Sequence, residues 1–197
     1  MPELVRLYKS LVLSFIESGT PGYFHASDSV LATIDRVQKR FLREVGLSEV
    51  DALVRFRLAP LGVRRCIAML GFLHRVTLGD VSTQILDMFP RLGPKACSSD
   101  DISSRVRGIT ALHDKQLVDR VSAGSSQQFK RSIFGMVQCY NALPQRLVDL
   151  KSIKSLQSAL QKGIIHRAQL GHDGWQNTFV DGRKYASLLQ FQRFFRI

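Results

Sequence analysis

The sequence predicts a mainly α-helical protein, a bundle of about six to eight helices. Apolar residues recur every three or four positions in several stretches, which is the helical period. Glycine and proline separate these stretches at intervals that suit helices rather than strands. Hydrophobic residues make up 45% and charged residues 22% of the 197, as in ordinary globular domains. One small β-hairpin around residues 105–135 is the only sheet structure that the pattern allows.

The first ninety residues give the clearest helical pattern. A first helix carries one apolar stripe formed by Leu4, Val5, Leu7, Tyr8, Leu11, Val12, Phe15 and Ile16, and Gly19, Pro21 and Gly22 end it. Asp28 is the expected N-cap of a second helix that runs to about Val45 and ends at Gly46. Ser48 can cap a short third helix. Pro60 begins a long fourth helix, and a short fifth one lies between Asp80 and Pro90.

The remainder alternates between loops and helices. Glycine, serine and proline make residues 91–127 loop-like, with Gln116 to Val121 as a short strand. A helix is expected from Gln128 to Ala142 and another from Ser152, its cap, to Ile164. A glycine-rich loop covers 171–184, and a last helix follows to Phe195. The expected organisation is therefore a helical region at 1–90, a loop-rich connector at 91–127, a helical region at 128–170 and a tail of uncertain order at 171–197.

Charge points to a polyanionic partner. The chain has 28 Lys and Arg against 16 Asp and Glu, a formal net charge of +12 that is spread along its length. Such an excess favours nucleic acid or an acidic membrane surface. No apolar run is long enough to span a membrane or has the form of a secretory signal, so a membrane partner is not expected. Three widely spaced cysteines indicate neither disulfides nor a zinc site and suggest an intracellular setting, nuclear or cytoplasmic.

The second helix carries a distinct cationic face. At 100° per residue its apolar residues fall on one side, while Arg36, Lys39, Arg40 and Arg43 fall together on the other. Like charges at this spacing repel by a few tenths of a kcal/mol per pair, roughly, and a phosphate backbone would reverse that cost. A solvated helix face is the alternative.

Two further cationic segments are candidates. On the fourth helix, Arg64 and Arg75 share a face with the small residues Ala68 and Gly71, which would let either a sugar–phosphate strand or another helix approach closely. Lys130–Arg131 lie near the expected start of a later helix, where cations oppose the helix dipole. A bound anion would relieve that conflict, and a loose surface is the other explanation.

The sequence contains no recognisable catalytic motif. The five histidines lack metal-binding spacing, and there is no nucleophile elbow, phosphate loop or dinucleotide fingerprint. Asp100 and Asp101 lie in a serine-rich stretch typical of a turn. We therefore expect no active site in this chain alone, and no metal or other cofactor.

The order of several motifs resembles the region after the catalytic core of non-LTR (LINE-like) retrotransposon reverse transcriptases. Ile16–Pro21 resembles that family's Glu-x-Gly-x-Pro step, and Ile34–Phe41 is similar to its Val-Gln-basic-basic helix. Leu58–Arg65, with its Arg64-Arg65 pair, is similar to the Leu-Gly-Leu and Arg-Arg segment. Tyr140–Pro144 matches a Trp-Asn-x-Leu-Pro motif, with tyrosine for tryptophan, and Ile153–Leu160 matches a following helix, with leucine for phenylalanine.

This resemblance implies a thumb-like helical region at 1–90 that binds a template–primer duplex of RNA or DNA through its phosphates. The palm, with its Mg²⁺ carboxylates, would belong upstream of Met1, and it is a further expected partner. The predicted nucleic-acid contacts, chosen from the cationic segments described above, are Arg36, Lys39, Arg40, Arg43, Arg64, Arg65, Arg75, Lys130 and Arg131. The alternative is a helical protein-interaction module whose basic faces are solvated. A thumb separated from its palm would also leave apolar surface uncovered near Leu4–Tyr8.

Overall fold

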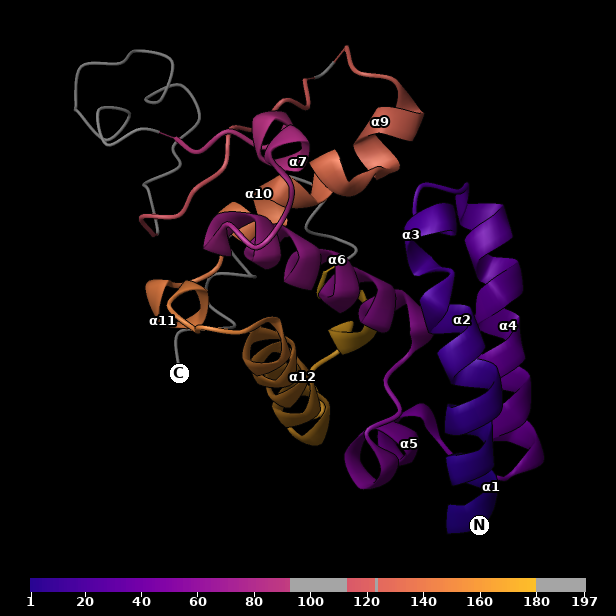
Figure 1. Cartoon of the computed structure of the whole chain (residues 1–197). Helices are drawn as coiled ribbons and strands as arrows, with labels where there is room; N and C mark the ends of the chain where they lie inside the picture. The colour runs from indigo at the N-terminus through magenta and orange to yellow at the C-terminus, as the bar shows by residue number, and fades with distance from the viewer. Residues whose placement is uncertain (93–112, 123, 180–197) are drawn as a thin grey trace.

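The computed structural model describes residues 1–92, 113–122 and 124–179, and it is mainly helical (Figure 1). Within these ranges no β-strand is formed, so the prediction of a helical bundle is confirmed. Two hydrophobic clusters organise the chain. The smaller one joins the first helices, and the larger one surrounds a long central helix and the C-terminal half of the described residues.

The first helix is continuous but not uniform. It comprises α1 (Pro2–Leu7), a π-helical segment η1 (Tyr8–Leu13) and α2 (Ser14–Ser18). A π turn holds more residues than an α turn, so Tyr8 and Leu13, five positions apart, both reach the core. The prediction of one stripe was wrong in part, because the structure exposes five of its members: Leu4, Leu7, Leu11, Val12 and Phe15.

The next helices begin close to their predicted caps. After the short α3 (Thr20–Tyr23), α4 spans Asp28–Glu44 and α5 spans Glu49–Phe56. Ser27, rather than Asp28, occupies the N-cap position of α4. Ser48 caps α5 as predicted, and its hydroxyl oxygen accepts the amide of Asp51 at 3.0 Å. α4 and the first helix lie side by side and antiparallel (Figure 1).

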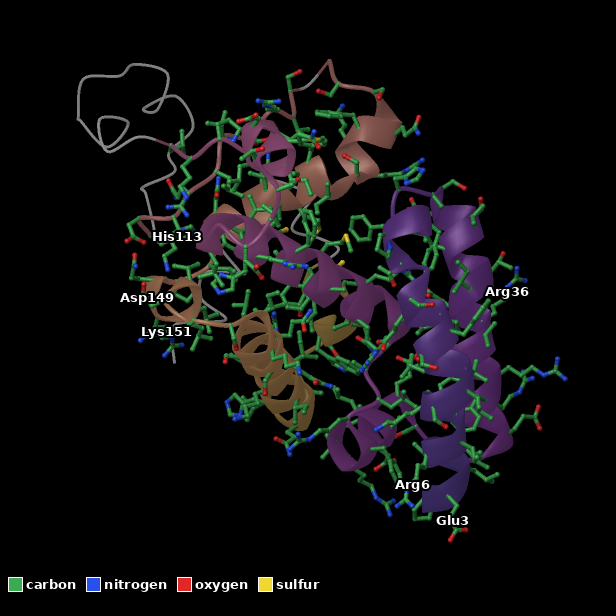
Figure 2. The ribbon with its side chains drawn as sticks, viewed as in Figure 1. Glu3, Arg6, Arg36, His113, Asp149 and Lys151 are labelled. Atoms are coloured by element: carbon green, nitrogen blue, oxygen red, sulfur yellow. The ribbon has the colours of Figure 1, made fainter. Side chains whose placement is uncertain are left out.

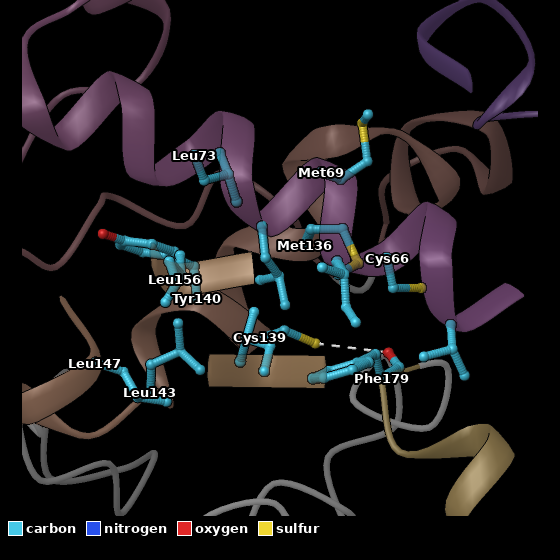
Figure 3. Packing of buried hydrophobic residues seen from close by; sticks show 14 of the residues in the cluster. Cys66, Met69, Leu73, Met136, Cys139, Tyr140, Leu143, Leu147, Leu156 and Phe179 are labelled. Carbon is cyan, nitrogen blue, oxygen red and sulfur yellow. Dashed lines mark hydrogen bonds between the residues drawn. The ribbon is translucent and has the colours of Figure 1, made fainter. Parts of the chain in front are cut away.

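α6 (Leu61–Leu78) is the central helix, and α7 (Thr83–Met88) follows it. The most extensive contact of α6 is with α12 (Ile153–Gln169). Ser152 caps α12, as predicted. Gly71 permits this packing, because a Cβ there would lie 2.6 Å from Gln157 Nε2 and 3.0 Å from Ile153 Cγ2. The larger cluster fills the space below α6 (Figure 3).

The predicted helix from Gln128 to Ala142 is instead three short pieces, α9 (Gln127–Arg131), the 3₁₀ turn η3 (Ile133–Met136) and α10 (Val137–Asn141). Ser132 breaks the helix with extended backbone, and its hydroxyl accepts the amide of Phe134 at 3.3 Å. The turn is so tight that a Cβ at Gly135 would lie 1.9 Å from the carbonyl oxygen of Lys130. A short helix, α11 (Gln145–Val148), precedes α12.

No hairpin forms in the described part of residues 105–135, which is a further departure from the prediction. The expected strand Gln116–Val121 contributes only an isolated antiparallel bridge between Leu117 and Arg91. The side-chain amide of Asn141 takes the place of a further strand. It accepts the Leu117 N–H at 2.9 Å and donates to the Leu117 carbonyl at 2.8 Å, which satisfies that backbone without a ladder.

The segment expected to be a loop after α12 supplies two core residues. Trp175, in the 3₁₀ turn η4 (Trp175–Asn177), and Phe179 are both buried in the larger cluster. The Cys139 thiol faces the Phe179 carbonyl oxygen at 3.8 Å (Figure 3). The helix expected over 188–195 lies outside the described residues.

A buried histidine, His74, joins α6 to α10 and to the segment that follows α11. The Leu150 carbonyl can only accept, so His74 Nε2 donates to it at 2.7 Å, and His74 Nδ1 accepts from the Tyr140 hydroxyl at 3.0 Å. The Thr77 hydroxyl lies 2.7 Å from the same phenolic oxygen. Burial lowers the pKa of His74 and raises the pKa of Tyr140 to about 12. The imidazole is therefore neutral, and both of its nitrogens are satisfied.

His113 completes this polar centre. It is buried, its Nε2 donates to the Tyr140 carbonyl at 3.1 Å, and its Nδ1 accepts the Lys115 amide at 3.1 Å. Burial lowers the pKa of His113 as well. His74 thus connects the central helix α6 to Tyr140, and His113 connects the segment before residue 117 to the same tyrosine.

We expect acid to destabilise the fold through these two histidines. The unfolded chain takes up protons near pH 6.5 while the folded chain does not, so the free energy of unfolding falls as pH drops below about 6.5. Each histidine contributes up to about 1.4 kcal/mol per pH unit. Urea denaturation between about pH 7.5 and pH 5 measures this slope. His74→Gln should reduce it and the exposed His25→Gln should not, whereas a flat profile in the parent chain would contradict the assignment.

Candidate nucleic-acid interface

The orientation of α4 is fixed from its buried side. Leu31, Gln38 and Leu42 are buried, and the Gln38 side chain donates to the Ala59 carbonyl at 3.0 Å. These contacts hold one face of the helix against the segment that leads into α6. The opposite face is left for solvent or a ligand.

All four cations predicted on that opposite face are exposed. Arg36 lies on the outer side of α4 (Figure 2), and its guanidinium donates to Thr33 Oγ1 at 2.8 Å. Arg43 is 3.7 Å from the carboxylate of Glu44, and both side chains are well exposed, so water screens this pair. Within the described residues neither Lys39 nor Arg40 forms an ion pair. The helix therefore presents a row of charges that the protein's own acids scarcely neutralise.

Lys39 occupies the inner edge of the row. It lines a groove between α4 and α6 together with Asp28 and Asp35, whereas Arg36 and Arg40 lie farther round the helix. Of the four cations, Lys39 alone lines this groove.

The three arginines predicted on α6 are engaged by carboxylates. Arg65 donates to both oxygens of Asp35, at 2.6 and 3.0 Å, and its side chain is only 7% exposed. Arg64 donates through Nε to Glu17. Arg75 donates to Asp80 at 3.1 Å. The structure thus uses these cations to join helices and cap α6, and we leave them out of the proposed interface.

The face with Ala68 and Gly71 packs against protein. Gln157 and Ile153 of α12 occupy the space beside Gly71, so of the two neighbours considered for this face the packed helix is the one present. Beyond it, Arg64 and Lys154 line a pocket between the first helices, α6 and α12.

Lys130 and Arg131 lie at the end of α9, not at its beginning. The helix has only five residues, and both cations are in its last turn, where they complement the dipole. The expected conflict with the helix dipole is therefore absent, because the helix ends earlier than the apolar pattern suggests, and a contact of these two residues with nucleic acid stays a prediction.

Further cations gather near the junction of α5 with the first helix. Lys9 donates to the Phe56 carbonyl, and burial, reinforced by Arg64 and Arg57, lowers the pKa of Lys9. Arg57, in the left-handed conformation with φ 53°, ends α5. The position of Lys9, four residues after the buried Val5, was the sequence signal that it faces inward.

Other site types are not indicated by the part of the chain that the structure covers. The described residues contain no group of three or more His, Cys, Asp or Glu side chains arranged to hold a metal ion. None of the described helices is both long and apolar enough to cross a bilayer. Comparison with known protein families, curated proteins and solved structures gives no match. The resemblance to reverse transcriptases thus rests on the order of sequence motifs.

Arg65 and Arg75 offer a matched test of their structural roles. Arg65→Ala would leave Asp35, which is 29% exposed, without its partner, and we expect it to lower the free energy of unfolding by about 2–3 kcal/mol. Arg75→Ala breaks an exposed pair and should cost less than about 1 kcal/mol. Urea denaturation measures both. The interpretation fails if Arg65→Ala is as stable as Arg75→Ala and instead loses more affinity for a nucleic-acid duplex.

Proposed function

We propose that the chain binds a nucleic-acid duplex, independently of sequence, through the cationic face of α4. The observation that carries the proposal is the exposed row Arg36, Lys39, Arg40 and Arg43, held by a buried opposite side. Repulsion along the row is unfavourable in the free protein, and phosphate oxygens would turn it into attraction. The net charge of +12 adds a long-range attraction to any polyanion.

The length of the row suits a phosphate backbone. From Arg36 to Arg43 the helix rises by about 10 Å, at roughly 1.5 Å per residue. A duplex presents one charge per roughly 1.7 Å of axis, so several phosphates fall within reach of the four side chains. Contacts of this kind position a protein on a duplex without reading its bases.

The motif order supports a more specific origin, as the thumb-like region of a non-LTR retrotransposon reverse transcriptase. In that case the ligand is the template–primer duplex. In that family the carboxylates that bind Mg²⁺ belong to the palm, and no residue of this chain is proposed to take their place. The proposed role is therefore to hold the duplex, not to perform nucleotide transfer.

Neutralising the row should change the salt dependence of binding. Arg36→Gln, Arg40→Gln and Arg43→Gln combined remove up to three phosphate contacts, so the slope of log K against log salt should decrease by up to about 2.7. Fluorescence anisotropy with a labelled RNA–DNA hairpin, between about 50 and 200 mM salt, measures the slope.

A matched control removes the same charge from another face. Lys151, Lys154 and Lys162 are exposed on or beside α12, and their combined change to Gln should alter the slope much less. Equal effects of the two triple variants would show diffuse attraction to the whole molecule. An unchanged slope in the α4 variant would remove this helix from the interface and favour the protein-interaction alternative.

A further inference from the structure

The first helix exposes an apolar stripe along its full length. Leu4, Leu7, Leu11 and Phe15 recur every three or four positions, and the exposed fraction reaches 68% at Leu11 and 79% at Phe15. From Leu4 to Phe15 the stripe spans at most about 17 Å, the length at the α-helical rise of roughly 1.5 Å per residue, because the π segment Tyr8–Leu13 rises less per residue. Single exposed apolar residues are common, but a continuous stripe of this kind marks a contact surface.

The neighbouring helix extends this surface. Tyr8 and Phe41 stack with ring centroids 4.1 Å apart, which fixes the level at which the two antiparallel helices meet. One turn further along the first helix lies Val12, and one turn back along α4 lies Val37, so these residues fall at the same level. Val37 and Val30 of α4 are also exposed. The stripe and these two valines form a two-helix apolar face.

One edge of this face is cationic. Successive residues of a helix are about 100° apart around its axis. Viewed down the axis of α4, the residues next to Val37 on one side are therefore Thr33, then Arg40, then Arg36. Two arginines thus border the apolar residues. A ligand that covers the face must combine an apolar side with an acidic edge. A second copy of the chain would bring a further +12 of charge to the contact, and a bare phosphate backbone has no apolar side.

We propose that the two-helix face, formed by Leu4, Leu7, Leu11, Phe15, Val30 and Val37, docks an acidic amphipathic helix of a partner protein. Leucine-type residues of the partner lie along the stripe, and its glutamates or aspartates pair with Arg36 and Arg40. Three turns of partner helix, at roughly 5.4 Å per turn, are enough to cover the stripe. This inference goes beyond duplex binding and has a consequence for it, because a partner and a duplex would compete for the same two arginines.

A synthetic peptide provides the probe. It has three helical turns with leucine on one side and glutamate on the edge, and a control peptide carries lysine in place of glutamate. Fluorescence anisotropy should show binding of the acidic peptide only. Leu11→Ser with Phe15→Ser should weaken it by at least about tenfold, while Leu170→Ser, at a residue 60% exposed at the end of α12, should have no effect.

Duplex binding separates this proposal from the preceding one. The serine variants should leave the affinity for the RNA–DNA hairpin unchanged, whereas the triple glutamine variant of α4 should weaken both ligands. Excess acidic peptide should also displace the hairpin. If the parent chain binds the acidic peptide but not the hairpin, only the duplex proposal is refuted.

Several outcomes would overturn the docking proposal. These are failure of the parent chain to bind the acidic peptide, equal binding of the lysine peptide, and equal weakening by Leu170→Ser. Sedimentation would also overturn it by showing a dimer that Leu11→Ser and Phe15→Ser dissociate, since a second copy would then cover the face. Circular dichroism confirms that the variants remain helical, and Leu4→Ser with Leu7→Ser serves as a second pair on the same stripe.

Discussion

The structure depends on burying α6 on nearly all sides without leaving its polar groups unsatisfied. Twelve of its 18 residues are buried, including Arg65, His74 and Thr77. A helix buried in this way must find a partner for each polar side chain, since an unpaired one would cost about 1–3 kcal/mol. Carboxylates from the N-terminal helices and a tyrosine from α10 supply those partners. The same bonds decide where the neighbouring helices lie.

The orientation of α4 is one result of this requirement. Asp35 lies on its inner side because Arg65 needs a carboxylate, and the polar side chain of Gln38 reaches the chain just before α6. With that side fixed, helical periodicity determines which residues face outward. The cationic row and the exposed valines are thus held in place by the core, so a ligand would not have to order the helix first.

Much of the fold could be predicted from local signals. Ser48 and Ser152 cap their helices, and Gly46 and Gly79 end theirs with positive φ, as their sequence contexts indicate. The cationic row on α4 follows from a simple period. The roles of Arg64 and Arg65 could not be predicted in this way, because Glu17 and Asp35 lie 47 and 30 residues away along the chain. Only the packed structure shows which of the many cations already have acids beside them.

The π segment has a consequence for the length of the chain. An ordinary α turn places every third or fourth residue on one side, whereas here the inward-facing Tyr8 and Leu13 are five positions apart. The π segment therefore contains one residue more than an α-helix would need to place these two side chains on the same side. Deletion of the outward-facing Val12 would restore regular winding while Val5 and Ile16 kept their places. The first helix thus contains a position at which evolution could add or remove a codon without moving either end.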